Sequence, residues 1–171
     1  MKTIITVGCM MAAAAIAAFA AGGAKMKISS SAFREGGTIP EKFSKNDQNV
    51  NPELRIDGVP AGARSLALIV DDPDAPVGLF THWLVWNIDP KTSEIAEKSV
   101  PKGGSQGTND FPGIGYDGPQ PPSGTHRYYF KIFALDRMLD LKSGAKRREV
   151  DAAMRGHVVA EGELMGRYSK K

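Results

Sequence analysis

Two apolar runs separated by an acidic, proline-bracketed turn constrain this chain more than any other feature. In the first run, Ser65–Val70, apolar side chains occupy both odd and even positions, which predicts a β-strand buried on both faces. The second run opens at His82 and continues to Ile88. Because proline lacks an amide donor and fixes φ, the turn Asp71–Pro76 between them cannot extend either strand. The turn therefore places carboxylates at the end of a sheet, beside His82, which is more typical of a site than of a core.

Length and charge restrict the class of protein. The 171 residues suffice for one domain with a substantial core, and nothing in the sequence indicates a second domain. The formal net charge is only +3 and no basic stripe carries interleaved aromatic residues, which argues against a nucleic-acid partner. The basic run Lys146–Arg148 and the tail Lys170-Lys171 are expected to be solvated surface charge.

The N-terminal segment is expected to be a signal peptide. A positive charge precedes an uncharged apolar run that ends at Ala21, and Ala18-Phe19-Ala20 has the small-x-small pattern of a cleavage site. Residues 1–20 would be removed, which leaves one domain over residues 21–171, in the periplasm or outside the cell, without stable membrane insertion. A transmembrane helix is the rival interpretation of this run, and a lipid anchor on Cys9 is a weaker one. Cys9 is the only cysteine, so the mature chain would have no disulfide.

Most of the remaining chain reads as strands and turns. Strands are expected at Lys25–Phe33, Asn51–Ile56, His126–Leu135 and Val158–Met165. Pro101–Gly124 is rich in Gly and Pro and is expected to be a long, ordered loop. Helical spacing of apolar residues predicts one helix, Arg147–Gly156. This pattern predicts a mainly β fold, an antiparallel β-sandwich with one or two peripheral helices.

Two of the three histidines are candidate site residues. His157 follows the predicted helix, where the helix dipole favours a cation, and a structural role is expected for it. His82 and His126 each open a strand directly after a Pro- or Gly-rich loop. One such histidine is more often a hydrogen-bonded core residue, but two of them, with Asp72 and Asp74 available, make a ligand site an equal alternative.

These residue types suit an anionic ligand. Protonated His82 or His126, loop amides and the Tyr128 hydroxyl would donate to a phosphate or carboxylate. Asp72 alone would repel an anion, so it is expected to accept from a histidine, fixing its tautomer and favouring imidazolium. An enzyme that uses a His–Asp pair as general base for hydrolysis or isomerisation is the second class, although no nucleophile motif is present. A His–Asp metal site is the weakest alternative, because no typical ligand spacing supports it.

Three ordered segments carry a resemblance to a known family: Asp72–Pro76, His82-Trp83 and Gly118–Tyr128. Together they resemble the signature of the phosphatidylethanolamine-binding protein (PEBP) family, and in particular its short bacterial and archaeal Raf-kinase-inhibitor-like branch. The similarity covers nearly the whole mature chain. It implies an antiparallel β-sandwich with a small anion-binding pocket at one end, no cofactor and no metal. It also implies an exported protein that binds a small phosphate- or carboxylate-bearing ligand, with a partner protein as a further expectation.

The resemblance also implies roles for individual residues. Those expected to bind the ligand are Asp72, His82, Gly118, His126 and Tyr128, and those expected to support the turn are Pro73, Asp74, Pro76 and Arg127. A cis Ala75–Pro76 bond is expected. Since Arg127 alternates with its neighbours along a strand, its side chain should point to the opposite face and form a buried pair with Asp74. Gln120 departs from the family, in which Cys is frequent at this position.

Overall fold

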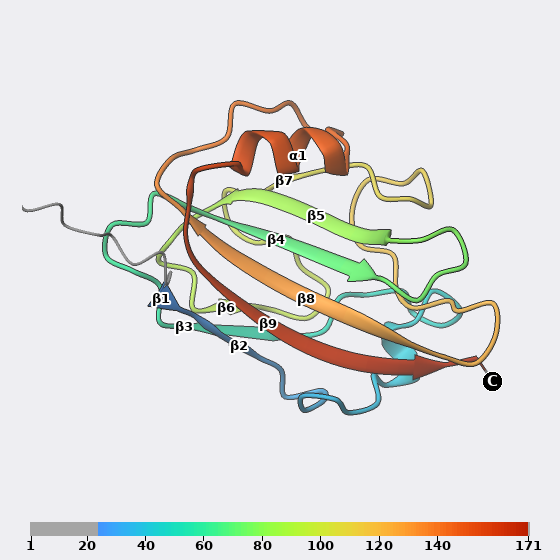
Figure 1. Ribbon diagram of the computed structural model, residues 1–171. Helices are drawn as coiled ribbons and strands as arrows, with labels where there is room; N and C mark the ends of the chain where they lie inside the picture. Colours follow the sequence, from blue (N-terminus) through green and yellow to red (C-terminus); the bar gives the residue numbers. More distant parts are fainter. Residues whose placement is uncertain (1–23, 171) are drawn as a thin grey trace, which may run out of the picture.

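In the computed structural model, residues 24–170 form two packed β-sheets with one α-helix on the outside (Figure 1). The larger sheet has the strand order β1 (Ala24–Lys25), β9 (Val158–Ser169), β8 (Thr125–Leu135), β4 (Ser65–Asp72), β5 (Phe80–Ile88) and β7 (Ser105–Gln106). The smaller sheet consists of β2 (Lys27–Ser29), β3 (Leu54–Asp57) and β6 (Glu94–Ile95). The helices are the 3-10 helix η1 (Glu41–Phe43) and α1 (Arg147–Met154). The predicted signal peptide, residues 1–20, lies outside the described residues.

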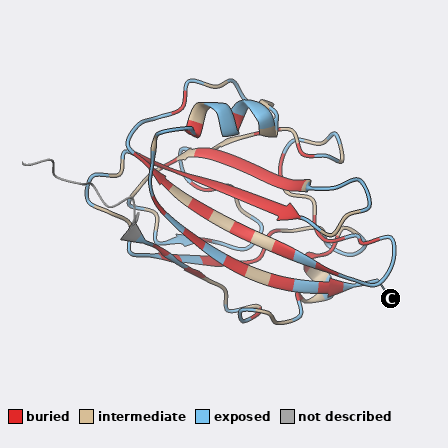
Figure 2. Ribbon diagram, viewed as in Figure 1, coloured by how far each residue is buried: buried red, intermediate tan, exposed pale blue. Residues whose placement is uncertain are grey.

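Strands β4 and β5 are the centre of the fold and are buried almost throughout (Figure 2). All eight residues of β4 are buried, as the two-faced apolar pattern predicts. The side chains of Leu66, Leu68 and Val70 belong to the core between the two sheets. Ala67 and Ile69 face the other way, into a second core beneath α1. The strand therefore separates two apolar compartments.

The outer strand pair shows the opposite pattern. Buried and more exposed residues alternate along β8 and β9, because only one face of these strands packs against the smaller sheet (Figure 2). On β8 the buried positions include His126, Tyr128 and Phe130. The alternation decides which β8 side chains face the interior end of the sheet.

The predicted fold is confirmed: two mainly antiparallel sheets with a peripheral helix. One departure is that β1 pairs with β9 in parallel. Helix α1 ends at Met154, two residues before Gly156, which has a positive φ of 78°. The cis Ala75–Pro76 bond is wrong, because residues 24–170 contain no cis peptide bond. The turn closes instead through hydrogen bonds, from the Asp74 amide to Asp72 Oδ1 and from the Gly78 amide to the Ala75 carbonyl.

Candidate ligand-binding site

Four of the predicted site residues meet at one end of the larger sheet. Asp72 ends β4, and β4 pairs antiparallel with β5 and β8, so its end adjoins the first residues of both. His82 comes from the start of β5, and His126 and Tyr128 come from the start of β8. All four side chains are buried. The cluster therefore has polar groups that are largely withdrawn from water.

The Asp72 carboxylate is held by two donors. Its Oδ2 lies 2.7 Å from His126 Nδ1, and its Oδ1 accepts the Asp74 amide at 2.8 Å. Because a carboxylate only accepts, His126 Nδ1 donates, and Nε2 is the ring nitrogen that remains for a ligand. Asp72 therefore does accept from a histidine, and the histidine is His126.

His82 is held differently. Its Nδ1 lies 2.7 Å from the Asp117 carbonyl oxygen, which can only accept, so Nδ1 carries the proton. Burial lowers the pKa of His82, outweighing the hydrogen bond to Asp117, which raises it. The imidazole is consequently neutral near pH 7, and its Nε2 is an acceptor. The expectation that protonated His82 would face an anion near neutral pH is therefore not supported, because burial opposes the charge.

Aromatic rings enclose His82. The rings of Phe80, Phe111 and Tyr128 lie 5.2, 5.4 and 5.2 Å from its ring, centroid to centroid. Phe80 and Phe111 also pack edge to face at 4.8 Å. This shell excludes water from the imidazole and explains why His82 is only 2% exposed.

The Tyr128 hydroxyl is the one unpartnered polar group of the cluster. Its Oη is buried and has no hydrogen-bond partner within residues 24–170. Burial, together with the nearby Asp72 charge, raises the pKa of Tyr128, so the group stays an O–H donor. Asp72 is close enough to exert this effect, yet the two groups do not have hydrogen-bond geometry. A buried, unused donor is uncommon and usually marks an unmodified or ligand-dependent feature of a site.

Gly118 has a packing role. A Cβ atom at this position would come within 1.9 Å of the Phe43 carbonyl oxygen, so only glycine lets the loop pass this close to η1. Its amide donates to Asn49 Oδ1 at 2.8 Å and is therefore already used. Its predicted contact with a ligand stays a prediction, whereas its structural importance is clear.

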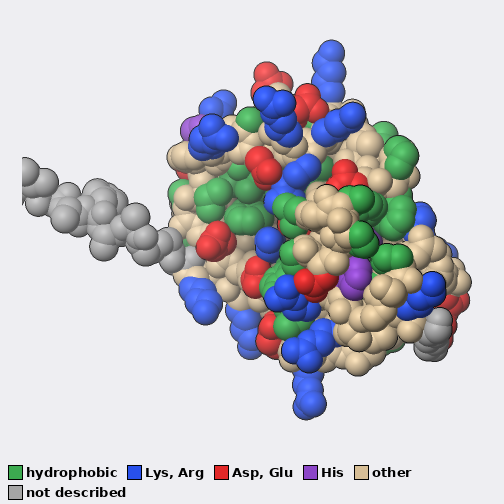
Figure 3. Space-filling model, turned by 45° about the vertical axis from the view of Figure 1, so that its right-hand side comes forward, with side chains coloured by type: hydrophobic (Ala, Val, Ile, Leu, Met, Phe, Trp, Pro, Cys, Tyr) green, Lys and Arg blue, Asp and Glu red, His purple; other side chains and the backbone are tan. Residues whose placement is uncertain are grey.

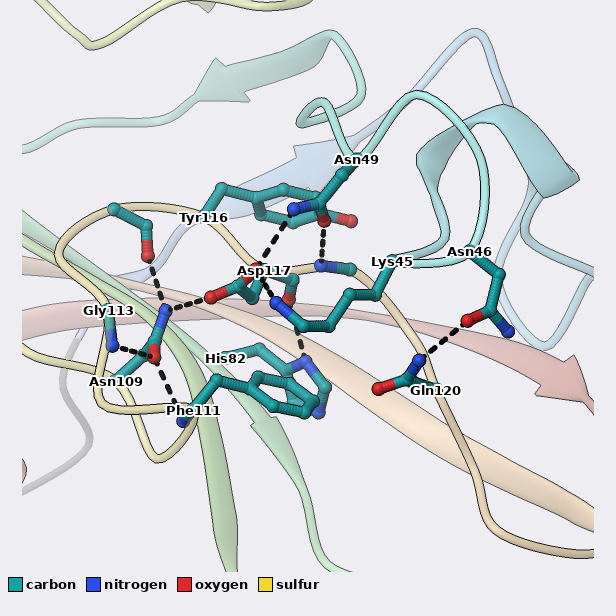
Figure 4. A network of polar contacts seen from close by, with 12 residues as sticks. Lys45, Asn46, Asn49, His82, Asn109, Phe111, Gly113, Tyr116, Asp117 and Gln120 are labelled. Atoms are coloured by element: carbon teal, nitrogen blue, oxygen red, sulfur yellow. Dashed lines mark hydrogen bonds and ion pairs between the residues drawn. The ribbon is translucent and has the colours of Figure 1, made fainter.

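Asp117, which the sequence did not single out, is the hub of a polar network behind His82 (Figure 4). Its Oδ1 accepts from Lys45 and from Asn49 Nδ2, and its Oδ2 accepts from Asn109 Nδ2 at 2.8 Å. Burial raises the pKa of Asp117, but these three donors bring it below its usual value. The network fixes the carbonyl that orients His82. The only signal in the sequence is that Asp117 directly precedes Gly118-Pro119.

The supporting turn contains the predicted Arg127–Asp74 contact. Arg127 donates to both carboxylate oxygens of Asp74, from Nε at 2.8 Å and from Nη2 at 2.6 Å. The Arg127 hydrogen bond lowers the pKa of Asp74 to about 2. However, the Arg127 side chain is 48% exposed, so the expectation of a buried pair is wrong. The pair lies at the surface because Arg127 faces away from the sandwich interior.

A groove of about 450 Å³ adjoins the cluster. Its lining residues are Glu41, Asn46, Gln120, Pro121, Pro122, Tyr168 and Lys170. Tyr168 pairs with His126 across β8 and β9, which places the groove next to His126. Figure 3 brings this end of the sheet forward, and a histidine side chain is visible there between hydrophobic side chains. Pro73 and Pro76 lie in the turn at the same end.

Two further searches bear on the alternatives. Among residues 24–170 no three His, Cys, Asp or Glu side chains are grouped so that they could hold a metal ion. Within the same range no helix combines the length and apolarity that a membrane span requires.

Comparison with known proteins gives consistent matches. The model of the family described as phosphatidylethanolamine-binding protein matches residues 29–169. The UPF0098 protein PH1269 of Pyrococcus horikoshii is 48% identical over 163 residues, which cover 88% of this chain and 81% of that protein. The structure of the PEBP homologue CT736 from Chlamydia trachomatis superposes with a TM-score of 0.82 at 41% identity, covering 86% and 99% of the two chains. Escherichia coli YbcL, described as a new member of the mammalian PEBP family, gives 0.81 at 29% identity, covering 86% and 100%.

Proposed function

Because the chain belongs to the phosphatidylethanolamine-binding protein family, we propose that it binds small ligands that carry a phosphate or carboxylate group. The observation that carries this proposal is the buried, unpartnered hydroxyl of Tyr128. Leaving such a donor unpaired costs about 1–3 kcal/mol, and a ligand oxygen would satisfy it. Anionic oxygens are the strongest acceptors for this purpose.

His126 supports the same proposal. Asp72 holds its Nδ1 at 2.7 Å, which fixes the ring and leaves Nε2 for a ligand. When the imidazole is protonated, Nε2 is a second donor, and the carboxylate behind it stabilises that state. Tyr128 and His126 alternate with Arg127 on β8 and are both buried, so two donors can converge on one ligand group.

Calorimetric titration of methyl phosphate and of acetate against the protein and its Tyr128→Phe variant tests the proposal. We expect Tyr128→Phe to weaken binding by about tenfold, because the ligand loses one hydrogen bond to an ionised group. Tyr116→Phe is the matched control: the Tyr116 hydroxyl already donates to the Phe43 carbonyl at 3.0 Å and should leave the affinity unchanged. Equal affinities of the Tyr128→Phe variant and the parent protein would refute the proposed role.

The short Asp72–His126 hydrogen bond favours one alternative, an enzyme in which this pair is a general base for hydrolysis or isomerisation. Proton NMR of the methyl phosphate sample separates the two functions. A binding protein leaves methyl phosphate intact. Release of methanol that disappears in His126→Asn would establish a hydrolase instead.

We further propose that the protein acts in the periplasm or outside the cell. The supporting observation is the N-terminal pattern of a positive charge, an apolar run and Ala18-Phe19-Ala20. N-terminal sequencing of the protein from its host should begin near Ala21. A soluble cytoplasmic form that retains Met1 would contradict export.

A further inference from the structure

The candidate site combines one fixed donor with one fixed acceptor. Tyr128 Oη carries a proton and lacks a partner, whereas His82 donates through Nδ1 and so presents the lone pair of Nε2. Neither group can exchange roles easily, because the Asp117 carbonyl determines the His82 tautomer. No hydrogen bond to His82 Nε2 is found in the described part of the chain, and Figure 4 shows only Nδ1 engaged.

The two groups are close together. The rings of His82 and Tyr128 lie 5.2 Å apart, centroid to centroid, at an interplanar angle of 82°. Such a separation lets a single tetrahedral oxoacid contact both groups. One of its oxygens would accept from Tyr128 Oη, and another would have to donate to His82 Nε2.

We propose that the site selects oxoacids that retain one hydroxyl, such as a phosphate monoester in its monoanionic form, over fully esterified analogues of the same charge; this inference rests on the proposed function. The monoester hydroxyl donates to His82 Nε2, and an unprotonated oxygen accepts from Tyr128. A diester or an alkyl phosphonate monoester has the acceptor oxygens but no hydroxyl. It would therefore bury Nε2 without a donor.

The aromatic shell makes this difference large. Phe80 and Phe111 pack around His82, so water cannot easily replace a missing ligand hydroxyl. An acceptor that is buried without a partner costs about as much as several net hydrogen bonds. Burial also keeps the imidazole neutral, since it lowers the pKa of His82.

Other ionisable groups face the site and shape the experiment. Asp72 approaches from β4 and His126 from β8, while Asp117 and Lys45 lie behind the ring and pair with each other. His126 can gain a proton when any anion binds, so a change of affinity with pH does not identify the group responsible. Two ligands of equal charge at one pH avoid this ambiguity.

The matched pair is methyl phosphate and methyl methylphosphonate, in which a methyl group replaces the hydroxyl with little change in size. At about pH 5.5 both carry predominantly one negative charge, since the second ionisation of a phosphate monoester occurs near pH 6. We expect calorimetry to show that methyl phosphate binds at least about tenfold more tightly. Equal affinities would overturn the inference while leaving the proposed function intact. Failure of both ligands to bind would overturn both.

A variant assigns the discrimination to His82. His82→Asn keeps a nitrogen donor near the position of Nδ1, facing the Asp117 carbonyl, and removes Nε2. The preference for methyl phosphate should fall to about twofold or less. His157→Asn is the control, because His157 pairs with Asp136 at 2.8 Å elsewhere on the surface and should keep the full preference. An unchanged preference in His82→Asn would overturn the assignment, and the parent protein alone decides the inference if this variant does not fold.

Discussion

Strand β4 ends in two carboxylates that have different surroundings. Asp71 faces the α1 side, is fully buried, and accepts from Arg147 and from Lys131, the latter at 3.4 Å. Asp72 faces the inter-sheet side and accepts from His126 and from a backbone amide. Consecutive strand residues point to opposite faces, so one residue of sequence separates the two environments.

The comparison separates a completed polar set from an incomplete one. Both partners of Asp71 are permanent cations, and Arg147 also approaches Thr81 Oγ1 at 3.4 Å, which ties β4, β5 and α1 together. On the Asp72 side, the Tyr128 hydroxyl has no partner among the described residues. Because buried polar groups are normally satisfied, the complete set indicates a structural role and the incomplete set indicates a ligand.

Breaking the complete set should give the largest effect. We expect Arg147→Ala to lower the free energy of unfolding in urea by about 3 kcal/mol, because it leaves a buried carboxylate with only Lys131 as a cation. Arg148→Ala is the matched control, since Arg148 is the next residue of the same helix and is exposed. Similar small losses in both variants would show that the Asp71 cluster contributes little.

This cluster also shows a limit of reasoning from sequence. The run Lys146–Arg148 was expected to be solvated charge, which is wrong for Arg147. Its partner Asp71 lies 76 residues earlier in the chain, and a local pattern does not contain that pairing. The turn at Asp71–Pro76 was correctly placed at a sheet end, but only the alternation of faces in the folded sheet assigns Asp71 and Asp72 to separate compartments.

The second comparison uses the two buried tyrosines. We expect Tyr116→Phe to lower the free energy of unfolding by about 1 kcal/mol, because it removes the hydrogen bond to the Phe43 carbonyl. Tyr128→Phe should cost nothing, or stabilise the free protein slightly, because its hydroxyl has no partner to lose within residues 24–170. Urea unfolding of both variants without ligand measures the difference. Equal losses would mean that Tyr128 has a partner in solution and that the set is complete.

Much of the candidate site was nevertheless predictable. Buried strands with loops at their ends imply that Asp72, His82, His126 and Tyr128 gather at one edge, and they do. The network around Asp117 was not predictable, because its donors come from two separate loops whose course depends on tertiary packing. The neutral state of His82 also depends on that packing, since the rings that bury it belong to different segments.

Asp74 provides the smallest and most exposed term of the comparison. Its pKa in the folded protein is about 2, below the ordinary value of 3.8, because Arg127 donates to it. A carboxyl group with a lowered pKa stabilises the fold fully above its unfolded pKa, and this contribution disappears as the pH falls through the folded value. The Asp74 contribution should therefore be present at about pH 6 and be lost between about pH 4 and 2.

Thermal unfolding of the protein and of Asp74→Asn across this range tests the assignment. We expect the variant to melt at a slightly lower temperature near pH 6, and the two curves to converge toward pH 2, where the carboxyl group of the parent protein is protonated. The difference should be well below that of Arg147→Ala, because solvent screens a pair whose arginine is 48% exposed. Asp140→Asn, at another exposed aspartate, should show no such convergence. A difference for Asp74→Asn that persists unchanged at pH 2 would mean that hydrogen bonding by the neutral side chain, rather than the ion pair, holds the turn against β8.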